Sequence, residues 1–367
     1  MRRLSILLCA MLLLSACARD KGNGDAVKME IVPSEEPLLE HVSSVELVPI
    51  EEDEDHLLGS RLAIKLLPDG GFILADRQNL NIFRYAADGS FLNTVGSKGR
   101  GPLEYPSIHN EQVRGDSVIV FTQTGKYDVY STTGEPLREC DIQNPGMGYY
   151  LVGDGILTYR GYQEKGSPRV LFTAGDGTQT PYLVTENAVL SLMAGWDVFS
   201  ETKDGTILFI DSFSDEIHSF KDGVFAPYLV FDFGDYAIDD QFFKVKDRME
   251  GAELLLGSSF AVIAGYQEGT RYSLVQVITQ EPHAQKSTRY CGLKCPDGKW
   301  CWFCLQNAFS REDLLFLSLS GKTLYTMVLP ESIDAFSACF ASKIAHPEIM
   351  KKGEDAPEHF LAKIHLK

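Results

Sequence analysis

Short apolar runs separated by glycine-containing turns recur along most of the chain. One run ends at Asp76, a second ends at Tyr85, and a third follows an Asp-Gly turn and ends at Val95. Apolar and polar residues alternate within these runs, which is the period-2 pattern of β-strands. The pattern therefore predicts antiparallel strands joined by tight hairpins.

This unit repeats four times at a nearly constant interval. The glycines that close its second turn lie 45, 43 and 46 residues apart, at Gly89, Gly134, Gly177 and Gly223. Glycine suits such turns because it adopts positive φ without steric cost. A unit of several short strands every 40–50 residues or so is typical of β-propeller blades, which bury their faces only against their neighbours.

The rest of the chain is expected to supply two further blades. The fifth blade is expected to lack an Asp-Gly turn and to comprise Gly257–Tyr266 and Arg271–Ile278. The sixth is expected to take its inner strands from Lys299–Leu305 and Asp313–Leu319, before a polar, partly helical insert near 330–355. We therefore predict an all-β, six-bladed β-propeller. The alternatives are five or seven blades, or a pair of β-sandwiches.

Two strands at the ends of this body still need partners. Val45–Ile50 begins the fold, and His359–Leu366 ends it with apolar side chains on one face. If both strands join the sixth blade, they close the ring and leave no sheet edge open. Both ends of the chain are therefore predicted to share that blade.

The N-terminus has the features of a bacterial lipoprotein leader. Arg2 and Arg3 precede an apolar run of thirteen residues, Leu4 to Ala16, which is too short to span a bilayer as a helix. Small residues then lead directly to Cys17, as in a lipobox, whereas an ordinary signal with a chance cysteine is the alternative. The expected organisation is a signal peptide at 1–16, a lipidated flexible tether at 17–43 and the propeller at 44–367.

Charge narrows the range of partners. The formal net charge is −17, and it becomes −19 once Arg2 and Arg3 leave with the leader. A surface this acidic argues against nucleic acid and against adhesion to anionic lipid by charge. It is compatible with a cation, sugar or peptide ligand, and also with charge that serves only solubility.

Four cysteines crowd into one short segment, at Cys291, Cys295, Cys301 and Cys304. Export would place them where disulfides form, so one or two bridges are expected there. A four-thiolate zinc site is an alternative, although the first pair is separated by three residues rather than the usual two. Plain buried thiols are the third alternative.

One segment supports a family resemblance. Gly96–Tyr105 resembles the Gly-x-Gly-Pro-x-Glu-Tyr segment of the NHL-like six-bladed β-propeller lipoproteins abundant in Bacteroidetes. The leader, the opening Val-Glu-Leu-Val-Pro strand and the closing Ile-His-Leu-Lys tail are similar too, whereas Ala356–His359 departs from the family's Asn-Pro. The resemblance implies a propeller in the cell envelope and no particular reaction.

Candidate ligand-binding residues lie where the chain should cross toward the central channel. Within Gly99–Tyr105 the candidates are Arg100, Glu104 and Tyr105, while the glycines and Pro102 build the turn. Other candidates lie where inner strands should begin: His109, Trp196 and Asp197, with Asn110, Tyr149, Trp300 and Trp302 nearby. Rings beside amides and carboxylates suit a sugar or a peptide, but the same residue types also fill propeller cores.

The sequence contains no His-x-His or His-Glu-x-x-His pair and no Gly-x-Ser-x-Gly elbow. We expect an envelope-anchored binding or scaffold protein for a glycan, peptide or protein partner, linked to nutrient uptake. The alternative is a propeller hydrolase or lyase that acts in the channel. No cofactor is predicted, apart from the channel-bound cation that this alternative allows. Ala18 follows Cys17, where an aspartate would signal inner-membrane retention, so the outer membrane is expected.

Overall fold

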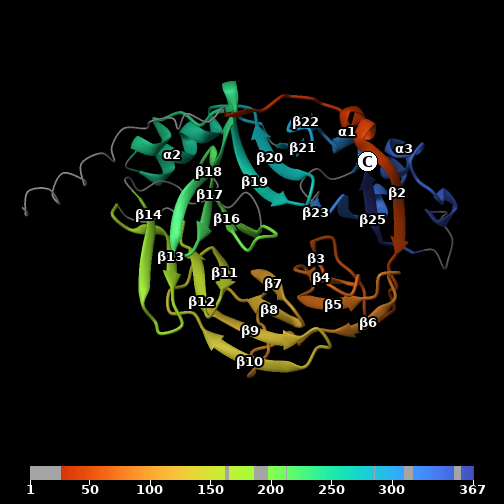
Figure 1. Cartoon of the computed structure of the whole chain (residues 1–367), viewed down its shortest axis with the longest axis horizontal. Helices are drawn as coiled ribbons and strands as arrows, with labels where there is room; N and C mark the ends of the chain where they lie inside the picture. The colour runs from red at the N-terminus through yellow and green to blue at the C-terminus, as the bar shows by residue number, and fades with distance from the viewer. Residues whose placement is uncertain are drawn as a thin grey trace, which may run out of the picture.

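The computed structural model describes residues 26–161, 165–185, 197–211, 213–245, 247–284, 286–309, 317–350 and 357–367. Six small sheets form a ring around a central axis (Figure 1). The prediction of an all-β, six-bladed propeller is confirmed. We number the blades 1 to 6 in the order in which their innermost strands follow along the chain.

The first four blades follow the predicted repeat. Blade 1 comprises β3 (Leu62–Leu66), β4 (Phe72–Asp76), β5 (Asn81–Tyr85) and β6 (Phe91–Thr94), and blade 2 comprises β7 (Asn110–Arg114), β8 (Ser117–Phe121), β9 (Lys126–Ser131) and β10 (Pro136–Asp141). Blade 3 comprises β11 (Gly148–Val152), β12 (Gly155–Tyr159), β13 (Pro168–Thr173) and β14 (Gln179–Val184). Blade 4 comprises β15 (Phe199–Glu201), β16 (Ile207–Ile210), β17 (Glu216–Lys221) and β18 (Val224–Asp232). All four turn glycines have positive φ, as expected.

The fifth blade differs from the prediction. It comprises β19 (Phe260–Glu268), β20 (Ser273–Gln280), β21 (Thr288–Lys294) and β22 (Trp300–Phe303). Trp300–Phe303 is thus its outermost strand and not an inner strand of blade 6. The blade also has its Asp-Gly turn, at Asp297 and Gly298, where Gly298 has φ +85°. A long connection that contains η1 (Gly234–Tyr236), η2 (Phe242–Lys244) and α2 (Arg248–Leu256) precedes the blade and breaks the spacing of the repeat.

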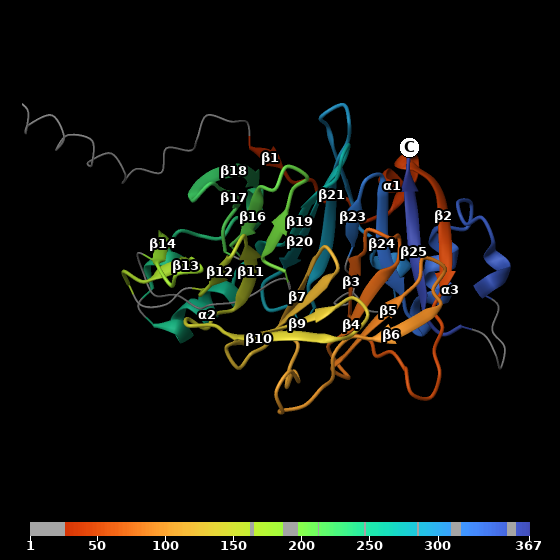
Figure 2. The same ribbon diagram turned by 60° about the horizontal axis from the view of Figure 1, so that its bottom comes forward.

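The sixth blade joins the two ends of the chain, as predicted. From the axis outward it comprises β23 (Ser318–Ser320), β24 (Thr323–Val328), β25 (Phe360–Leu366) and β2 (Val42–Pro49). Val45 of β2 pairs with Ile364 of β25, which in turn pairs with Leu324 of β24. Figure 2 shows β2 and β25 side by side at this closure.

The segment just before the ring is part of the fold, contrary to the predicted tether. Residues of β1 (Val27–Lys28) pair in parallel with the outer strand β18 of blade 4. The chain then passes blade 5, where Ser34 accepts a hydrogen bond from the Cys304 amide, and forms α1 (Glu36–His41) beside blade 6. Leu38 of α1 is fully buried. We call residues 26–41 the strap. Buried apolar residues such as Met29 and Leu38 pack the strap against the ring.

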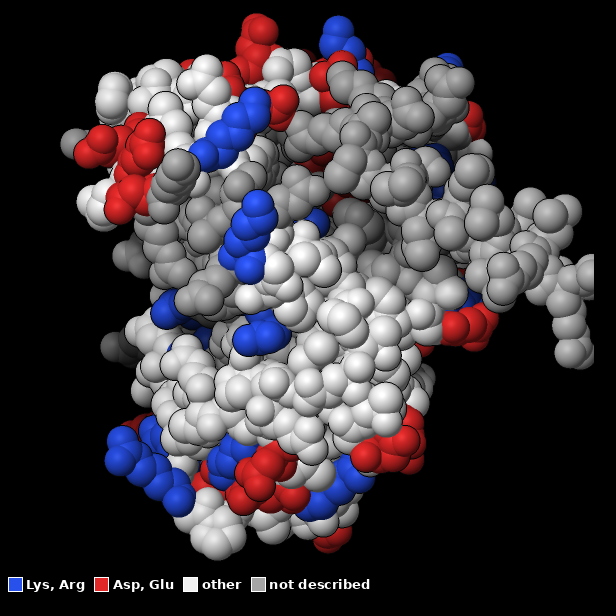
Figure 3. Space-filling model, turned by 90° about the vertical axis from the view of Figure 1, so that its left-hand side faces the viewer, with Lys and Arg blue, Asp and Glu red and all other residues white. Residues whose placement is uncertain are grey.

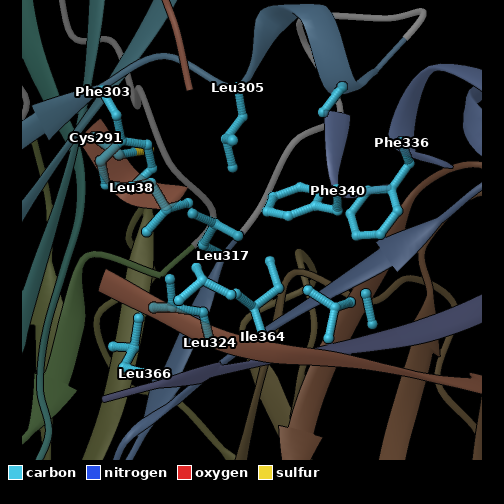
Figure 4. Close-up of a cluster of buried hydrophobic side chains, with 14 of the residues drawn as sticks. Leu38, Cys291, Phe303, Leu305, Leu317, Leu324, Phe336, Phe340, Ile364 and Leu366 are labelled. Atoms are coloured by element: carbon cyan, nitrogen blue, oxygen red, sulfur yellow. The ribbon is translucent and has the colours of Figure 1, made fainter. Parts of the chain in front are cut away.

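Buried apolar clusters lie between all successive blades. The cluster between blades 5 and 6 includes Leu38, Phe303, Leu324 and Ile364 (Figure 4). It also holds Phe336 and Phe340 from the predicted partly helical insert, which forms η5 (Pro330–Ser332), α3 (Ile333–Cys339) and η6 (Pro347–Met350) between β24 and β25, while η3 (Gln306–Ala308) follows β22. Each blade thus packs its faces against its neighbours, and α1 and α3 add apolar side chains to the contact between blades 5 and 6.

The acidic excess is unevenly spread over the surface. On the side shown in Figure 3, uncharged side chains cover much of the face, and Lys and Arg lie among patches of Asp and Glu. The net charge therefore does not make a uniform acidic shell. Among the described residues, no helix is long and apolar enough to cross a membrane.

Candidate binding site in the central channel

The innermost strands of the six blades surround a cavity of about 380 Å³. Its lining comes from β3, β7, β11, β15, β19 and β23. We call the end at which these strands begin the connector mouth, because the chain arrives there from the previous blade. The end at which they turn into the second strands is the hairpin mouth.

Four charged side chains meet inside this channel. Arg77 follows β4 and places Nη2 2.9 and 2.8 Å from the two carboxylate oxygens of Glu111 on β7. Lys65 on β3 places Nζ 2.5 Å from Oδ2 of Asp197 and 3.9 Å from Oε1 of Glu111. Nη2 of Arg77 also lies 3.9 Å from Oδ1 of Asp197. Two cations and two carboxylates thus form one neutral network, which we call the channel quartet.

The ion pair between Lys65 and Asp197 crosses the axis of the ring. Lys65 belongs to blade 1 and Asp197 precedes β15 of blade 4, which lies opposite in a ring of six. Burial disfavours the charged form of Lys65, but the carboxylates of Asp197 and Glu111 outweigh it and raise its pKa. Burial likewise opposes ionisation of Asp197, yet Lys65 and Arg77 hold its pKa below the usual value. Both groups stay charged at neutral pH.

His109 lies next to the quartet, directly before β7. Its ring meets Tyr149 edge-on, with 5.6 Å between the ring centroids. Burial lowers the pKa of His109, and the positive charge of Arg77 lowers it further. The imidazole is therefore neutral at physiological pH.

Three polar atoms beside the quartet are buried without a hydrogen-bond partner. They are Nε2 of His109, Oδ1 of Asn110 and Oγ of Ser200. Asn110 and Ser200 line the cavity, and Asn110 is only 5% exposed. Buried polar atoms normally have a partner in the protein, in water or in a ligand. The three atoms are closed off from the cavity as its walls stand, so a ligand or water would pair with them only if neighbouring side chains moved.

Side-chain amides fix the spacing of the inner strands. Gln112 of blade 2 accepts from the Leu151 amide at 2.8 Å and donates to the Leu151 carbonyl at 3.1 Å, in blade 3. Gln276 of blade 5 bonds both backbone groups of Leu317 in the same manner. Each glutamine thus links two blades by a pair of hydrogen bonds to one backbone residue, as two neighbouring strands of a sheet are linked. The positions of the channel walls are therefore fixed before any ligand binds.

The hairpin mouth has a different chemistry. Tyr150 donates to Glu201 at 2.8 Å, and Tyr266 and Tyr228 both donate to Glu268 at 2.7 Å. Burial, together with the neighbouring carboxylate, raises the pKa of Tyr150 and of Tyr266. Their hydroxyls remain protonated donors, and the two mouths thus differ in charge: the quartet is neutral, whereas this end carries carboxylates.

The chain is similar to a known protein family and to solved structures. The family model described as "Domain of unknown function (DUF4934)" matches residues 32–329. The chain belongs to the DUF4934 family. No curated protein is similar to it in sequence.

Solved structures share the fold of this DUF4934 protein. An exported protein from Bacteroides fragilis is similar with a TM-score of 0.72 and 14% identity, over 93% of this chain and 99% of that chain. A member of the DUF4221 family from Bacteroides vulgatus has a TM-score of 0.56 and 10% identity, over 89% and 97%. The virginiamycin B lyase of Staphylococcus aureus reaches a TM-score of 0.45 at 9% identity, over 88% and 99%. At these identities the first two likenesses concern the fold alone, and nothing is concluded from the third.

The glycine-rich segment of this DUF4934 protein forms a tight turn away from the channel lining. Glu104 accepts a hydrogen bond from the Gly101 amide at 2.7 Å. A Cβ at Gly99 would collide with the Glu104 carboxylate, so any other residue there would displace that side chain and its bond to the Gly101 amide. Tyr105 is fully buried and donates to the Val95 carbonyl. The structure therefore gives no support to Glu104 or Tyr105 as ligand-binding residues, and Arg100 is exposed outside the cavity.

Residues of blade 2 pin this turn. Tyr130 donates to the Leu103 carbonyl at 2.9 Å, and Glu139 accepts from the Leu103 amide at 3.2 Å. Asp128 lies opposite Glu139 in the sheet, is fully buried, and has no hydrogen-bond partner at either carboxylate oxygen. Burial, and then the charge of Glu139, raise its pKa to about 6 against the pull of Lys126.

Asp128→Asn is expected to stabilise the protein at pH 8 by about 1–2 kcal/mol, and much less at pH 4. Below the unfolded pKa the native carboxyl keeps its proton at no cost. Between the ordinary carboxyl pKa of 3.8 and the native pKa of about 6, the unfolded chain loses this proton more readily than the native protein, so stability falls over this interval and the loss is complete above about 6. Denaturant unfolding at both pH values measures the difference. Asp204→Asn, which alters an exposed partner of Lys221, is the control, and an equal gain at both pH values would contradict this account.

Four of the predicted contact residues lie at the connector mouth, and among them Asn110 and Tyr149 line the cavity. Asp197 lines the cavity, and His109 lies beside the quartet. Trp196 is outside the described residues. Trp300 and Trp302 lie on the outer strand β22, stacked on each other, so they are remote from the channel, contrary to expectation. Lys65, Arg77 and Glu111 were not predicted. A lysine inside the apolar run Leu62–Leu67 was the available signal.

The cysteine cluster forms part of the core and of the outer hairpin of blade 5. Cys291 and Cys295 are buried, and Cys291 lies among apolar side chains (Figure 4). No disulfide joins the six described cysteines, so the expected bridges among Cys291, Cys295, Cys301 and Cys304 stay a prediction. Burial raises the pKa of Cys291 to about 12 and of Cys301 to about 11, which keeps both thiols protonated. In the described part of the chain, no three His, Cys, Asp or Glu side chains are placed to hold a metal ion.

Proposed function

We propose that this DUF4934 protein is an envelope-anchored binding protein that takes a sugar unit of a glycan into the connector mouth of its channel. The observation that carries the proposal is the convergence of the quartet on a cavity wall that also holds the polar side chains of Asn110 and Ser200. Sugars are recognised by many directed hydrogen bonds to hydroxyl groups in preformed pockets. A neutral network of charges offers such bonds without repelling a neutral ligand.

Two properties of the mouth support binding. Its walls are held by backbone-directed amides such as Gln112, so little ordering accompanies association. Its charged groups are mutually neutralised, and hydrogen bonds to charged groups are stronger than those between neutral groups. A cavity of about 380 Å³ lies in the range of small-molecule sites.

A glycan array probed with the full chain tests the proposal. We expect discrete hits that weaken on the order of tenfold or more in His109→Phe and Ser200→Ala, because each variant removes one hydrogen-bonding atom. Asp204→Asn, outside the channel, should bind like the wild type. Melting temperatures check that all variants fold. Hits that ignore both channel variants, or no hits at all, would overturn the proposal, and cleavage of a bound glycan would favour the hydrolase or lyase alternative.

Export and lipid attachment at Cys17 complete the proposal. Val27 on blade 4 is the tenth residue after Cys17, and ten extended residues span at most about 36 Å. The ring would thus stay close to the outer membrane. Cys17→Ser should release the protein from the membrane fraction into the soluble fraction, and retention in the membrane fraction would contradict the anchor.

A further inference from the structure

The two carboxylates of the quartet are held in different ways. Glu111 is fully buried, and both of its oxygens bond the same guanidinium nitrogen of Arg77. Asp197 reaches the quartet from outside β15 and keeps 36% of its side chain exposed. Its Oδ2 faces Lys65 and its Oδ1 faces Arg77. Glu111 is thus fixed in the wall, whereas Asp197 extends into the mouth from its rim.

We infer that the Asp197 carboxylate occupies the place of a ligand carboxylate, and that the site takes an acidic sugar such as a uronic acid. This inference rests on the proposed function and names its ligand class. The carboxylate of the sugar would lie between Lys65 and Arg77, and its hydroxyl groups would lie along the cavity wall that includes Asn110 and Ser200.

Charge balance favours a carboxylate over a neutral group at this point. The charged and titratable groups that face Asp197 are Lys65, Arg77 and His109, and the last is neutral. A neutral sugar that displaced Asp197 would leave Lys65 without its nearest counter-charge, which is costly for a group only 22% exposed. A ligand carboxylate restores that pair. Asp197 regains water as it turns outward, because it already lies at the rim.

A matched pair of ligands tests this directly. The full chain is titrated calorimetrically with galacturonate and with galacturonic acid methyl ester, which differ only in the charge of one group. We expect the wild type to prefer galacturonate. Asp197→Asn should raise the affinity for galacturonate on the order of tenfold, because the competing carboxylate is gone, and should also raise that for the ester, because no ion pair with Lys65 is then broken, so the preference for galacturonate is kept. Lys65→Met should abolish the preference.

The control and the outcomes separate this inference from the proposed function. Asp204→Asn also removes a carboxylate paired with a lysine, but on the exposed turn after β15, and should change neither affinity. No gain for galacturonate in Asp197→Asn, or a preference for galacturonate that survives in Lys65→Met, would overturn the inference. If the ester or neutral glycans still bind in a manner sensitive to Ser200→Ala, the proposed function stands without it. If no sugar binds the wild type or any variant, both fail.

Discussion

Replacing Arg77 with methionine is expected to lower the free energy of unfolding by about 3–5 kcal/mol. Arg77 is 3% exposed, and it neutralises Glu111, whose side chain is fully buried on β7. Methionine fills a similar volume but, among the described residues, leaves the carboxylate with Lys65 at 3.9 Å as its nearest cation. A buried charge that has lost its main partner costs far more than the pair contributed. Urea unfolding followed by circular dichroism measures the loss.

Two comparisons show whether the loss of stability comes from the charge of Glu111 that has lost its partner. Arg77→Met combined with Glu111→Gln removes both charges, so the double variant should be clearly more stable than Arg77→Met alone. Arg84→Met removes an arginine that pairs with the half-exposed Asp69 on the surface of blade 1, and it should cost about 1 kcal/mol or less. A double variant no more stable than the single one would show that Arg77 acts through packing instead.

The first four blades could be predicted because their turns carry local signals. Gly89 and Gly134 have positive φ of +86° and +91°, and an added Cβ at either would strike the backbone of the neighbouring blade. Such positions exclude other residues, so the glycines appear in the sequence at the period of the blades. The closure of the ring was predictable because the last strand, Phe360–Leu366, has apolar residues at every second position and therefore one apolar face.

The last two blades and the strap were less accessible from the sequence. The helix α2 and the insert after β24 change the spacing, so the repeat alone misassigned Trp300–Phe303 to blade 6. Residues 26–41 looked like a tether because they are polar and short of large apolar groups. Leu38 nevertheless docks between blades 5 and 6, a contact that depends on side chains far along the chain.

The candidate site was predicted only where it follows from connectivity. His109 and Asp197 precede inner strands, and strand order alone brings such residues to the axis. The partner of Asp197 is Lys65, 132 residues earlier and in the opposite blade, and no local pattern encodes that distance. Tyr105 was misjudged for the converse reason, because a tyrosine in a connecting turn can serve the core as well as a ligand.

Replacing Ile364 with alanine is expected to destabilise the fold by about 2–5 kcal/mol, because Ile364 is fully buried where the ends of the chain meet. Ile364 pairs with Val45 on β2 and with Leu324 on β24. The void left by the smaller alanine side chain would therefore weaken the contact of both neighbouring strands with β25. Lys363→Ala, the adjacent residue on the same strand, removes a partly exposed ion pair with Glu46 and should cost about 1 kcal/mol or less. Thermal and urea unfolding compare the two. Similar losses would mean that β25 is held mainly by its backbone ladder; a much larger loss at Ile364 would place the stability of the ring in the apolar seam of blade 6.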